Sequence, residues 1–315
     1  MHIPYLSHTE LEALNISPAE IIQCIENTIR GSASGRVWAA PKAVVVPPQD
    51  QRYMMAALAA QDNPSLLAVK TVVLNPDNPE HGLPQINGLV TMLDSATGLP
   101  AAILDGNWVT AVRTAGLSLT AAKYLARAAS ATIGFVGCGV QASSHLALFN
   151  DIYPLKEVVF FGRGQANQDR LAGEATSMGL AAHPCPTADE VLARADIVVT
   201  TVTHTTGAPP FLDAGAMKKG SFAAIVDLAA PWHRQSFAEL DSVIIDDLAQ
   251  EAALPNKLCD PELVTGDLSG LVLNTANGRQ TESERTAFVF RGHALGDLAL
   301  SVAALQRYRR DHSDG

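Results

Sequence analysis

The residues best suited to chemistry in this sequence form a glycine-rich turn that reads Gly137-Cys138-Gly139-Val140-Gln141-Ala142. The apolar run 133–136 precedes the turn and a helix-compatible segment follows it, which is the order strand, turn, helix. Gly137 lets the turn tighten, Gly139 lets the backbone approach a pyrophosphate, and Ala142 allows the helix to pack closely on the strand. The helix N-terminus would present free N–H groups to the phosphates. A tight turn without a ligand is the alternative, but the context favours a dinucleotide, for which we assign Gly137, Gly139, Val140, Gln141 and Ala142.

The ends of two strands indicate which dinucleotide this is. The apolar run 157–161 is followed by Gly162-Arg163-Gly164, without a carboxylate. In NAD-binding versions of this arrangement an acidic residue there holds the ribose hydroxyls, whereas Arg163 can pair with a 2′-phosphate. We therefore predict NADP(H) as the preferred cofactor, with NAD(H) as the alternative. The apolar strand 196–202 ends at the same edge, so Thr201 and Val202 are predicted to contact the cofactor.

Two cationic side chains occur in apolar surroundings. Lys70 is in the middle of the apolar run 66–74, and Arg113 is near the start of a helix predicted for 108–127, among small residues. A buried lysine needs a partner, because taking its charge out of water is costly. The simpler alternatives are a lysine on the wet face of a strand and an exposed helix arginine. We predict instead that both side chains point into a pocket, where Arg113 grips a carboxylate with two parallel hydrogen bonds.

Asp227 is the acidic candidate. It follows the apolar strand 222–226, at the carboxyl edge where open α/β sheets bind ligands. A carboxyl group there can donate or accept a proton. The alternative is a helix or turn cap.

The elements that must position these groups fall into two parts. The segments before residue 105 are predicted to be mainly β after one helix, which Ser17 caps and Pro18 begins. From residue 133 strands alternate with helices, which is typical of a parallel sheet. Residues 255–292 are predicted to be loop-rich with short elements, and 292–308 to form a closing helix. The chain is therefore predicted to be α/β.

Composition excludes several classes of function. The 315 residues are 47% hydrophobic, enough for two domains or one large one. The net charge is −10 and no basic stripe occurs, which argues against nucleic acid and anionic membranes as partners. No apolar run approaches the ~18 residues that span a bilayer, so we predict a cytoplasmic protein. The four cysteines lie far apart, so neither a metal site nor a disulfide is expected.

The stretch from Gly82 to Arg127 carries the most specific resemblance to a known family. It contains Gly82-Leu83-Pro84, Leu93-Asp94-Ser95-Ala96-Thr97-Gly98, Asp105-Gly106 and Arg113-Thr114-Ala115, and the chain later adds the glycine turn with Gln141 and Gly292-His293-Ala294 with Asp297. On these residues the chain resembles the ornithine cyclodeaminase/μ-crystallin family. This family includes archaeal-type alanine dehydrogenases and ketimine or pyrroline-carboxylate reductases.

The resemblance implies a fold of two parts. Residues 1–122, completed by 293–315, would form an α/β platform domain for substrate binding and dimerisation. Residues 123–292 would form an inserted Rossmann domain that binds NAD(P). The active site would lie in the cleft between them, and the protein would be a homodimer.

The resemblance also assigns roles to single residues. It implies that Lys70 and Arg113 bind the carboxylate of the substrate, and that Thr114 contacts the cofactor. Lys42 stands where the family commonly has an arginine, and a lysine cannot grip a carboxylate with two parallel hydrogen bonds.

A second departure concerns the reaction itself. The cyclodeaminases carry an aspartate at the position of Ala229, and the nearest carboxylate in this chain is Asp227. The μ-crystallin-like ketimine reductases also lack that aspartate, so the departure favours imine reduction.

We therefore predict an enzyme that reduces a C=N bond beside a carboxylate, in a small amino or imino acid. Lys70, Arg113 and Lys42 would anchor the carboxylate, and Asp227 or a water molecule would supply a proton. The alternatives are ornithine cyclodeamination with NAD recycled, chemistry like that of alanine dehydrogenase, and a non-catalytic NADP-dependent ligand-binding protein.

Overall fold

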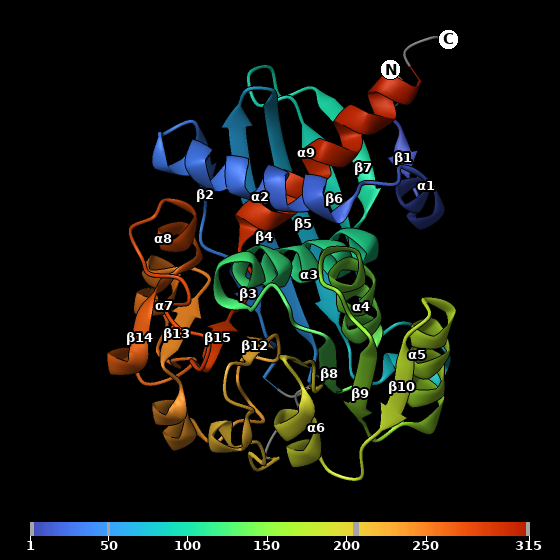
Figure 1. Ribbon diagram of the computed structural model, residues 1–315. Coiled ribbons are helices and arrows are strands. Elements are labelled where there is room, and N and C mark those ends of the chain that lie inside the picture. Colours follow the sequence, from blue (N-terminus) through green and yellow to red (C-terminus); the bar gives the residue numbers. More distant parts are fainter. Residues whose placement is uncertain (1–2, 49–50, 204–207, 313–315) are drawn as a thin grey trace. The chain divides into compact units, whose positions relative to one another are not determined.

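The computed structural model describes residues 3–48, 51–203 and 208–312, and its contacts divide the chain into two units (Figure 1). The platform unit comprises Met1–Arg113 and His293–Gly315, and the parallel-sheet unit comprises Thr114–Gly292. The break falls inside helix α3 (Gly106–Leu125), earlier than the boundary predicted after residue 122.

The platform unit is built on one mixed sheet. Its strands are β1 (Tyr5–Leu6), β2 (Val37–Ala39), β3 (Ala43–Val45), β4 (Tyr53–Asp62), β5 (Ser65–Leu74), β6 (Ile86–Leu93) and β7 (Pro100–Asp105). They are ordered β1-β7-β6-β5-β4-β2, and β3 also pairs with β4. The unit also contains α1 (His8–Ala13), α2 (Pro18–Ala33), the 3-10 helix η1 (Asn78–His81) and α9 (Ala294–Asp311). Helix α9 packs on β4 and β5, and α2 packs on α9 (Figure 1).

The N-terminal helices begin at capping boxes. Ser17 caps α2, its hydroxyl accepts from the backbone N–H of Glu20, and Pro18 occupies the first turn, as predicted. Ser7 and Glu10 form a second capping box, which begins the six-residue helix α1. The sequence predicted only one helix in this region, the one that Ser17 caps, because a helix as short as α1 shows no apolar period.

The alternation of β5 gives the platform sheet an inner and an outer face. Alternate residues of β5, including Lys70, are buried. The outer face exposes Leu58, Val73 and Leu89 at 39%, 40% and 42% of their surface. A sheet face that leaves large apolar side chains in water is typical of an interaction surface.

The parallel-sheet unit contains a sheet in which every pairing is parallel. Its order is β10-β9-β8-β11-β12-β15-β13-β14. The strands are β8 (Thr132–Val136), β9 (Glu157–Phe161), β10 (Ala181–Pro184), β11 (Ile197–Thr200), β12 (Phe222–Ile225), β13 (Ser242–Ile245), β14 (Val264–Asp267) and β15 (Thr286–Val289). The central strands β11, β12 and β15 are buried throughout, as expected for strands covered on both faces.

Helices and short turns connect these strands. The helices are α4 (Val140–Ile152), α5 (Gln165–Ser177), α6 (Ala188–Arg194), α7 (Leu248–Ala253) and α8 (Leu268–Val272), and the 3-10 turns are η2 (Ala214–Ala216), η3 (Arg234–Glu239) and η4 (Pro261–Leu263). Thr187 caps α6, and its hydroxyl accepts from the backbone N–H of Glu190. The strand β15 lies within 255–292, which the sequence predicted to be loop-rich, and it separates β12 from β13.

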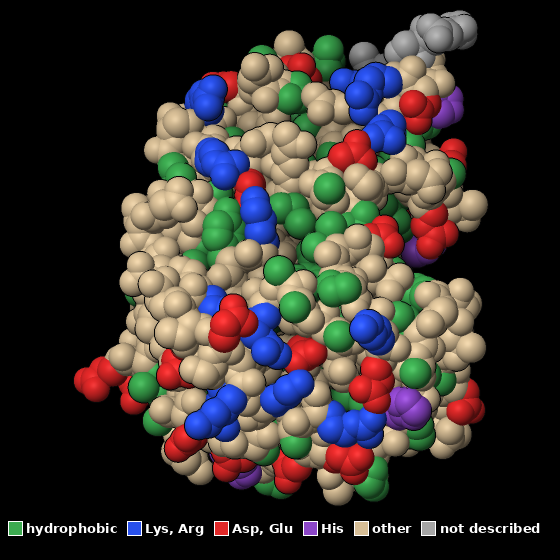
Figure 2. Space-filling model, viewed as in Figure 1, with side chains coloured by type: hydrophobic (Ala, Val, Ile, Leu, Met, Phe, Trp, Pro, Cys, Tyr) green, Lys and Arg blue, Asp and Glu red, His purple; other side chains and the backbone are tan. Residues whose placement is uncertain are grey.

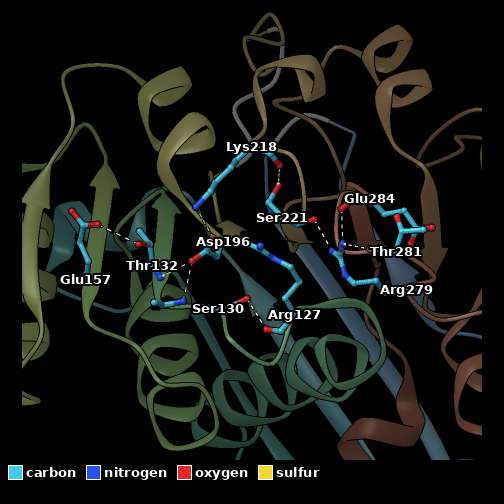
Figure 3. A network of polar contacts seen from close by, with 11 residues as sticks. Arg127, Ser130, Thr132, Glu157, Asp196, Lys218, Ser221, Arg279, Thr281 and Glu284 are labelled. Carbon is cyan, nitrogen blue, oxygen red and sulfur yellow. Dashed lines mark hydrogen bonds and ion pairs between the residues drawn. The ribbon is translucent and has the colours of Figure 1, made fainter.

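Asp196 ties the parallel sheet together at the start of β11 (Figure 3). Its Oδ1 lies 2.7 Å from both Arg127 Nη2 and Lys218 Nζ. Its Oδ2 accepts the backbone N–H groups of Ala131 and Thr132, at 2.9 and 3.1 Å. The buried carboxylate therefore joins the segments that lead into β8 and β11 to the loop before β12.

On the face drawn in Figure 2, Lys and Arg side chains are interspersed with Asp and Glu side chains. None of the described helices combines the length and hydropathy needed to cross a bilayer. Within the described residues, no cluster of three or more His, Cys, Asp or Glu side chains is arranged to hold a metal ion. Cys24, Cys138, Cys185 and Cys259 are free thiols.

Candidate active site

Lys70 is a buried lysine in the centre of β5. Its inward position follows from the alternation of the strand, and its backbone neighbours are Ala57 on β4 and Val90 on β6. Only 1% of Lys70 is exposed, so the alternative that this lysine lies on a solvent-exposed face of the strand is wrong. Since neither neighbouring residue can pair with an ammonium group, its partner must come from elsewhere in the unit.

That partner is Asp297, in the first turn of α9. Its Oδ1 lies 2.6 Å from Lys70 Nζ and 2.9 Å from Arg113 Nε on α3. Arg113 and Asp297 are 7% and 4% exposed. One carboxylate oxygen therefore faces two buried cations. The sequence placed Asp297 only within the family's closing helix and missed its role, although an acid in the first turn of a helix rich in Leu and Ala was a usable signal.

The charges in this cluster shift one another's pKa. Burial, and then the charge of Arg113, lower the pKa of Lys70 to about 7, although Asp297 acts in the opposite direction. Burial tends to raise the pKa of Asp297, but the charges of Arg113 and Lys70 outweigh it and leave that pKa lowered. The charge of Lys42 also lowers the pKa of both groups. Asp297 is therefore ionised at neutral pH and is outnumbered by cations.

The guanidinium of Arg113 has buried donors that make no hydrogen bond. Its Nε forms the ion pair with Asp297 but no hydrogen bond, and its Nη1 is buried without a hydrogen-bond partner. A buried donor without an acceptor is unfavourable, and native proteins rarely leave one. An excess of buried positive charge together with this free donor is suited to an anionic ligand, and a carboxylate matches the planar geometry of the guanidinium.

Gly137 shapes the turn after β8. Its φ is +95°, and a Cβ at this position would lie 2.7 Å from the carbonyl oxygen of Thr201. Thr201 in turn donates from its hydroxyl to the carbonyl of Gly137 at 3.1 Å. The structure thus brings Thr201 to the glycine turn, as the sequence predicted from the strand ends.

Gly139 fits a different requirement. It is the N-cap of α4 with φ −79° and no side-chain capping bond, and a Cβ on it would meet nothing within 4 Å. Nothing in the chain itself therefore requires glycine at this position. A ligand phosphate above the open helix N-terminus does require it, so the turn fits a dinucleotide. Val140 is 64% exposed at the same helix end, and Ala142 is buried against the strand.

Arg163 follows the end of β9 and is exposed. Beside it, a Cβ on Gly162 would lie 2.9 Å from Cys138 Sγ, so the glycine turn packs directly on this loop. Arg170 on α5 fixes the same turn by donating to the carbonyl of Cys138 at 2.8 Å. The sequence gave no indication of this role for Arg170.

Asp227 lies at the carboxyl edge of the parallel sheet. Its Oδ1 accepts from the hydroxyl of Thr200 at 3.1 Å, and its Oδ2 accepts from the N–H of Val202 at 3.0 Å. Burial raises its pKa to about 7. Leu228 and Ala229 follow with φ of +58° and +56°, a region that residues with side chains rarely adopt.

The structure therefore gathers the predicted residues into two groups. In the platform unit Lys70 and Arg113 meet at Asp297, and the charge of Lys42 acts on Lys70 and Asp297. In the parallel-sheet unit Thr201, Val202 and Asp227 lie together with the glycine turn, Thr201 against Gly137. Thr114 is buried on α3.

Comparison with known proteins gives the family. A model of the Ornithine cyclodeaminase/mu-crystallin family matches residues 5–304. The chain belongs to this family. The resemblance predicted from the sequence, and the α/β fold with a Rossmann-type unit, are thus confirmed.

Three relatives illustrate the range of this family. The alanine dehydrogenase of Archaeoglobus fulgidus is 27% identical over 307 residues, which cover 94% of this chain and 92% of the relative. The ketimine reductase mu-crystallin of Rattus norvegicus is 29% identical, with 95% and 91% covered. The structure of Thermococcus litoralis Delta(1)-pyrroline-2-carboxylate reductase with NADH and L-proline has a TM-score of 0.89 at 23% identity, with 99% and 98% covered. The names of these relatives agree with the prediction of an enzyme.

Proposed function

We propose that this family member is an NADP(H)-dependent reductase of a C=N bond beside a carboxylate, such as that of pyrroline-2-carboxylate or an acyclic ketimine. The observation that carries the proposal is the buried pair Lys70 and Arg113, which share a single carboxylate oxygen of Asp297. This cluster retains positive charge and a free Arg113 donor, both of which suit the carboxylate of an amino or imino acid.

Each residue has a separate task in the reaction. Lys70 and Arg113, assisted by the charge of Lys42, hold the substrate carboxylate and fix the imine carbon, and such positioning supplies much of the rate. The glycine turn and Arg163 would hold the cofactor, which supplies a hydride when bound. Reduction also consumes a proton at nitrogen. We assign this proton to Asp227, directly or through water, because burial raises its pKa to about 7.

The residue at position 229 favours reduction over cyclodeamination. The position of the cyclodeaminase aspartate is Ala229, which has no titratable side chain and cannot take a proton from an amine. Asp227 is held by Thr200 and by the N–H of Val202 at a different position of the chain.

The test is an assay of the purified protein with pyrroline-2-carboxylate and either NADPH or NADH. In parallel, ornithine is supplied with NAD, and pyruvate is supplied with ammonia and reduced cofactor. Oxidation of NADPH on the imine, with no proline formed from ornithine, supports the proposal. Proline and ammonia from ornithine would establish a cyclodeaminase, and turnover of pyruvate alone would establish a dehydrogenase. Tight cofactor binding with no turnover would indicate a binding protein.

We expect Arg163 to set the cofactor preference. The R163A substitution should weaken NADPH binding about 10-fold or more, which is the scale of one lost charge-assisted hydrogen bond to a phosphate. The affinity for NADH, which lacks the 2′-phosphate, serves as the internal control and should not change. Titration of the protein fluorescence with each cofactor measures both. Equal weakening for the two cofactors would show that Arg163 does not read the phosphate.

We expect Gly139 to matter more for the cofactor than for folding. The added methyl group of G139A meets no atom of the chain, so the melting temperature should fall only by the modest cost of replacing a glycine N-cap with alanine. The methyl group would, however, occupy the space of a bound pyrophosphate. NADPH affinity should therefore fall by about 10-fold or more, the effect of losing ~1.4 kcal/mol. G173A, which also adds a methyl group in open space but lies within α5, is the matched control. Unchanged affinity in G139A would rule out this phosphate site.

We also propose a homodimer. The outer face of the platform sheet exposes Leu58, Val73 and Leu89, which a second subunit would cover. The dimer itself stays a prediction from the family resemblance.

A further inference from the structure

The cluster in the platform unit contains one acid whose task is not explained by binding a substrate carboxylate. Asp297 is negatively charged, so it should oppose the binding of another anion at the same place. A site evolved only to attract a carboxylate would gain from an uncharged residue there. The position of Asp297 within the cluster offers another explanation.

We propose that Asp297 is the positioning residue of this anion site: its carboxylate holds Lys70 and Arg113 side by side, oriented to receive a substrate carboxylate, and keeps Lys70 charged. This inference rests on the proposed function, because it concerns the same site. It assigns Asp297 no contact with substrate.

The geometry supports the positioning role. One oxygen of Asp297 is 2.6 Å from Lys70 Nζ and 2.9 Å from Arg113 Nε, although these two cations repel each other. Asp297 itself is fixed, because it lies in the first turn of α9, where His293 Nδ1 accepts the N–H of Leu295 at 3.1 Å. Helix α9 packs on β5, the strand that carries Lys70. Asp297 therefore joins groups from three elements through a rigid helix.

Asp297 lies on the Nε side of Arg113. The two groups form an ion pair at 2.9 Å without a hydrogen bond, and Nη1 is buried without a hydrogen-bond partner. The fork of an arginine offers two donors in parallel to a carboxylate. Because the ion pair with Asp297 occupies the Nε side, the terminal nitrogens of Arg113 are left for a ligand.

The charge of Lys70 depends on the same carboxylate. The charged groups that act on Lys70 are Arg113 from α3, Asp297 from α9 and Lys42 from the segment before β3. The adjacent strands place the apolar residues Ala57 and Val90 beside it. Among those three groups Asp297 alone raises the pKa of Lys70, whereas burial and the two cations lower it. Without Asp297, Lys70 would lose its proton at a lower pH and with it its attraction for a carboxylate.

The test measures how a carboxylate binds as a function of pH. Pyrrole-2-carboxylate, a planar carboxylate that cannot be reduced here, is titrated calorimetrically into wild type, D297N and D297E between about pH 5 and 9, a range that contains the pKa of Lys70 and the downward shift expected of D297N. Wild-type affinity should fall as the pH rises through the pKa of Lys70. In D297N the midpoint of this fall should move down by at least about one pH unit, so that affinity is about 10-fold weaker above it, because each unit changes the charged fraction tenfold. D297E, which restores the charge, should return the midpoint toward that of wild type.

The opposite result is equally clear. If Asp297 only competes with the ligand, D297N should bind pyrrole-2-carboxylate more tightly at every pH, and the inference is overturned. An unchanged midpoint in D297N overturns it as well. D311N, at the exposed end of the same helix, is the matched control and should behave as wild type.

Two further comparisons apply if D297N does not fold or if wild type does not bind or turn over its ligand. If D297N does not fold, K70M is compared with K70M/D297N: weaker binding by the double variant supports positioning of Arg113, and tighter binding overturns it. If wild type does not bind the carboxylate at all, the inference fails. If wild type binds it with the expected pH shifts but does not reduce the imine, the proposed function fails and the inference is supported.

Discussion

Replacing Lys70 by methionine is expected to lower kcat/KM for pyrroline-2-carboxylate by about 10³-fold, since removing one member of a buried charge pair costs about 2–5 kcal/mol. Methionine fills the space of the lysine stem but brings no charge, so the buried Asp297 is left with Arg113 alone. The ligand then loses an anchor and the site loses its excess of positive charge. Most of the effect should appear in KM, with a smaller loss in kcat from misplaced substrate.

The pH dependence follows from the same residue. Lys70 has a lowered pKa, chiefly through burial, and binds a carboxylate only when protonated. Wild-type kcat/KM should therefore fall as pH rises, with a midpoint well below the usual lysine value of about 10.4. In K70M the remaining alkaline fall should be that of Asp227 alone, the assigned proton donor, and the affinity for pyrrole-2-carboxylate should no longer depend on pH in this range. K156M removes an exposed lysine and serves as the control. A K70M enzyme that keeps a tenth or more of the activity would show that Lys70 does not anchor the substrate.

Replacing Asp196 by alanine is expected to destabilise the protein by about 3 kcal/mol, the scale of two backbone N–H groups left without acceptors and two weakened cations. The N–H groups of Ala131 and Thr132 lose their partner at the entry to the sheet, and Arg127 and Lys218 face each other without the carboxylate between them (Figure 3). The two cations remain partly exposed, so water compensates them better than it compensates the backbone groups. Urea unfolding of both proteins measures the difference.

The difference in the free energy of unfolding between wild type and D196A should become smaller in acid. Burial alone would raise the pKa of Asp196, but hydrogen bonds from Lys218 and the backbone outweigh it and leave the pKa lowered. A lowered folded-state pKa contributes stability that is fully present above the unfolded-state value of about 3.9 and is lost as pH falls through the folded-state value. Wild type and D196A should therefore differ by a constant amount between pH 6 and 8 and converge in strong acid. D151A removes an exposed acid and should change stability little. A gap that stays constant into acid would mean that the charge of Asp196 contributes nothing.

Local chemistry explains which parts of the fold the sequence could predict. Ser17 and Pro18 determine where α2 begins by bonds within a few residues, so this start is visible in the sequence. Strand β15 is different, because Thr286–Val289 is a four-residue run inside a polar, turn-rich region. The residues of this run are compatible with a strand, but its place between β12 and β13 depends on pairing across the sheet, which no local pattern contains.

The candidate site divides in the same way. Lys70 and Arg113 stood out because a cation in an apolar segment needs an anion. The anion that they share is Asp297, which lies 227 residues after Lys70, so no local pattern links the two residues. The glycine turn was recognisable because Gly137, Gly139 and Ala142 lie within six residues of sequence. The support from Arg170 was not, because Arg170 reaches the turn from α5, a later helix.

The central place of β15 also constrains how the chain can fold while it is being synthesised. Strands β8 to β12 can pair in the order β10-β9-β8-β11-β12 as soon as residue 225 has left the ribosome, but β13 and β14 have no place in the sheet until β15 has emerged. During that interval β12 is the edge strand of the nascent sheet. Its outer backbone N–H and C=O groups are unpaired, although its side chains are buried in the finished protein. Such an edge is where one growing chain can pair with another, so this interval is the one in which the protein is most exposed to aggregation.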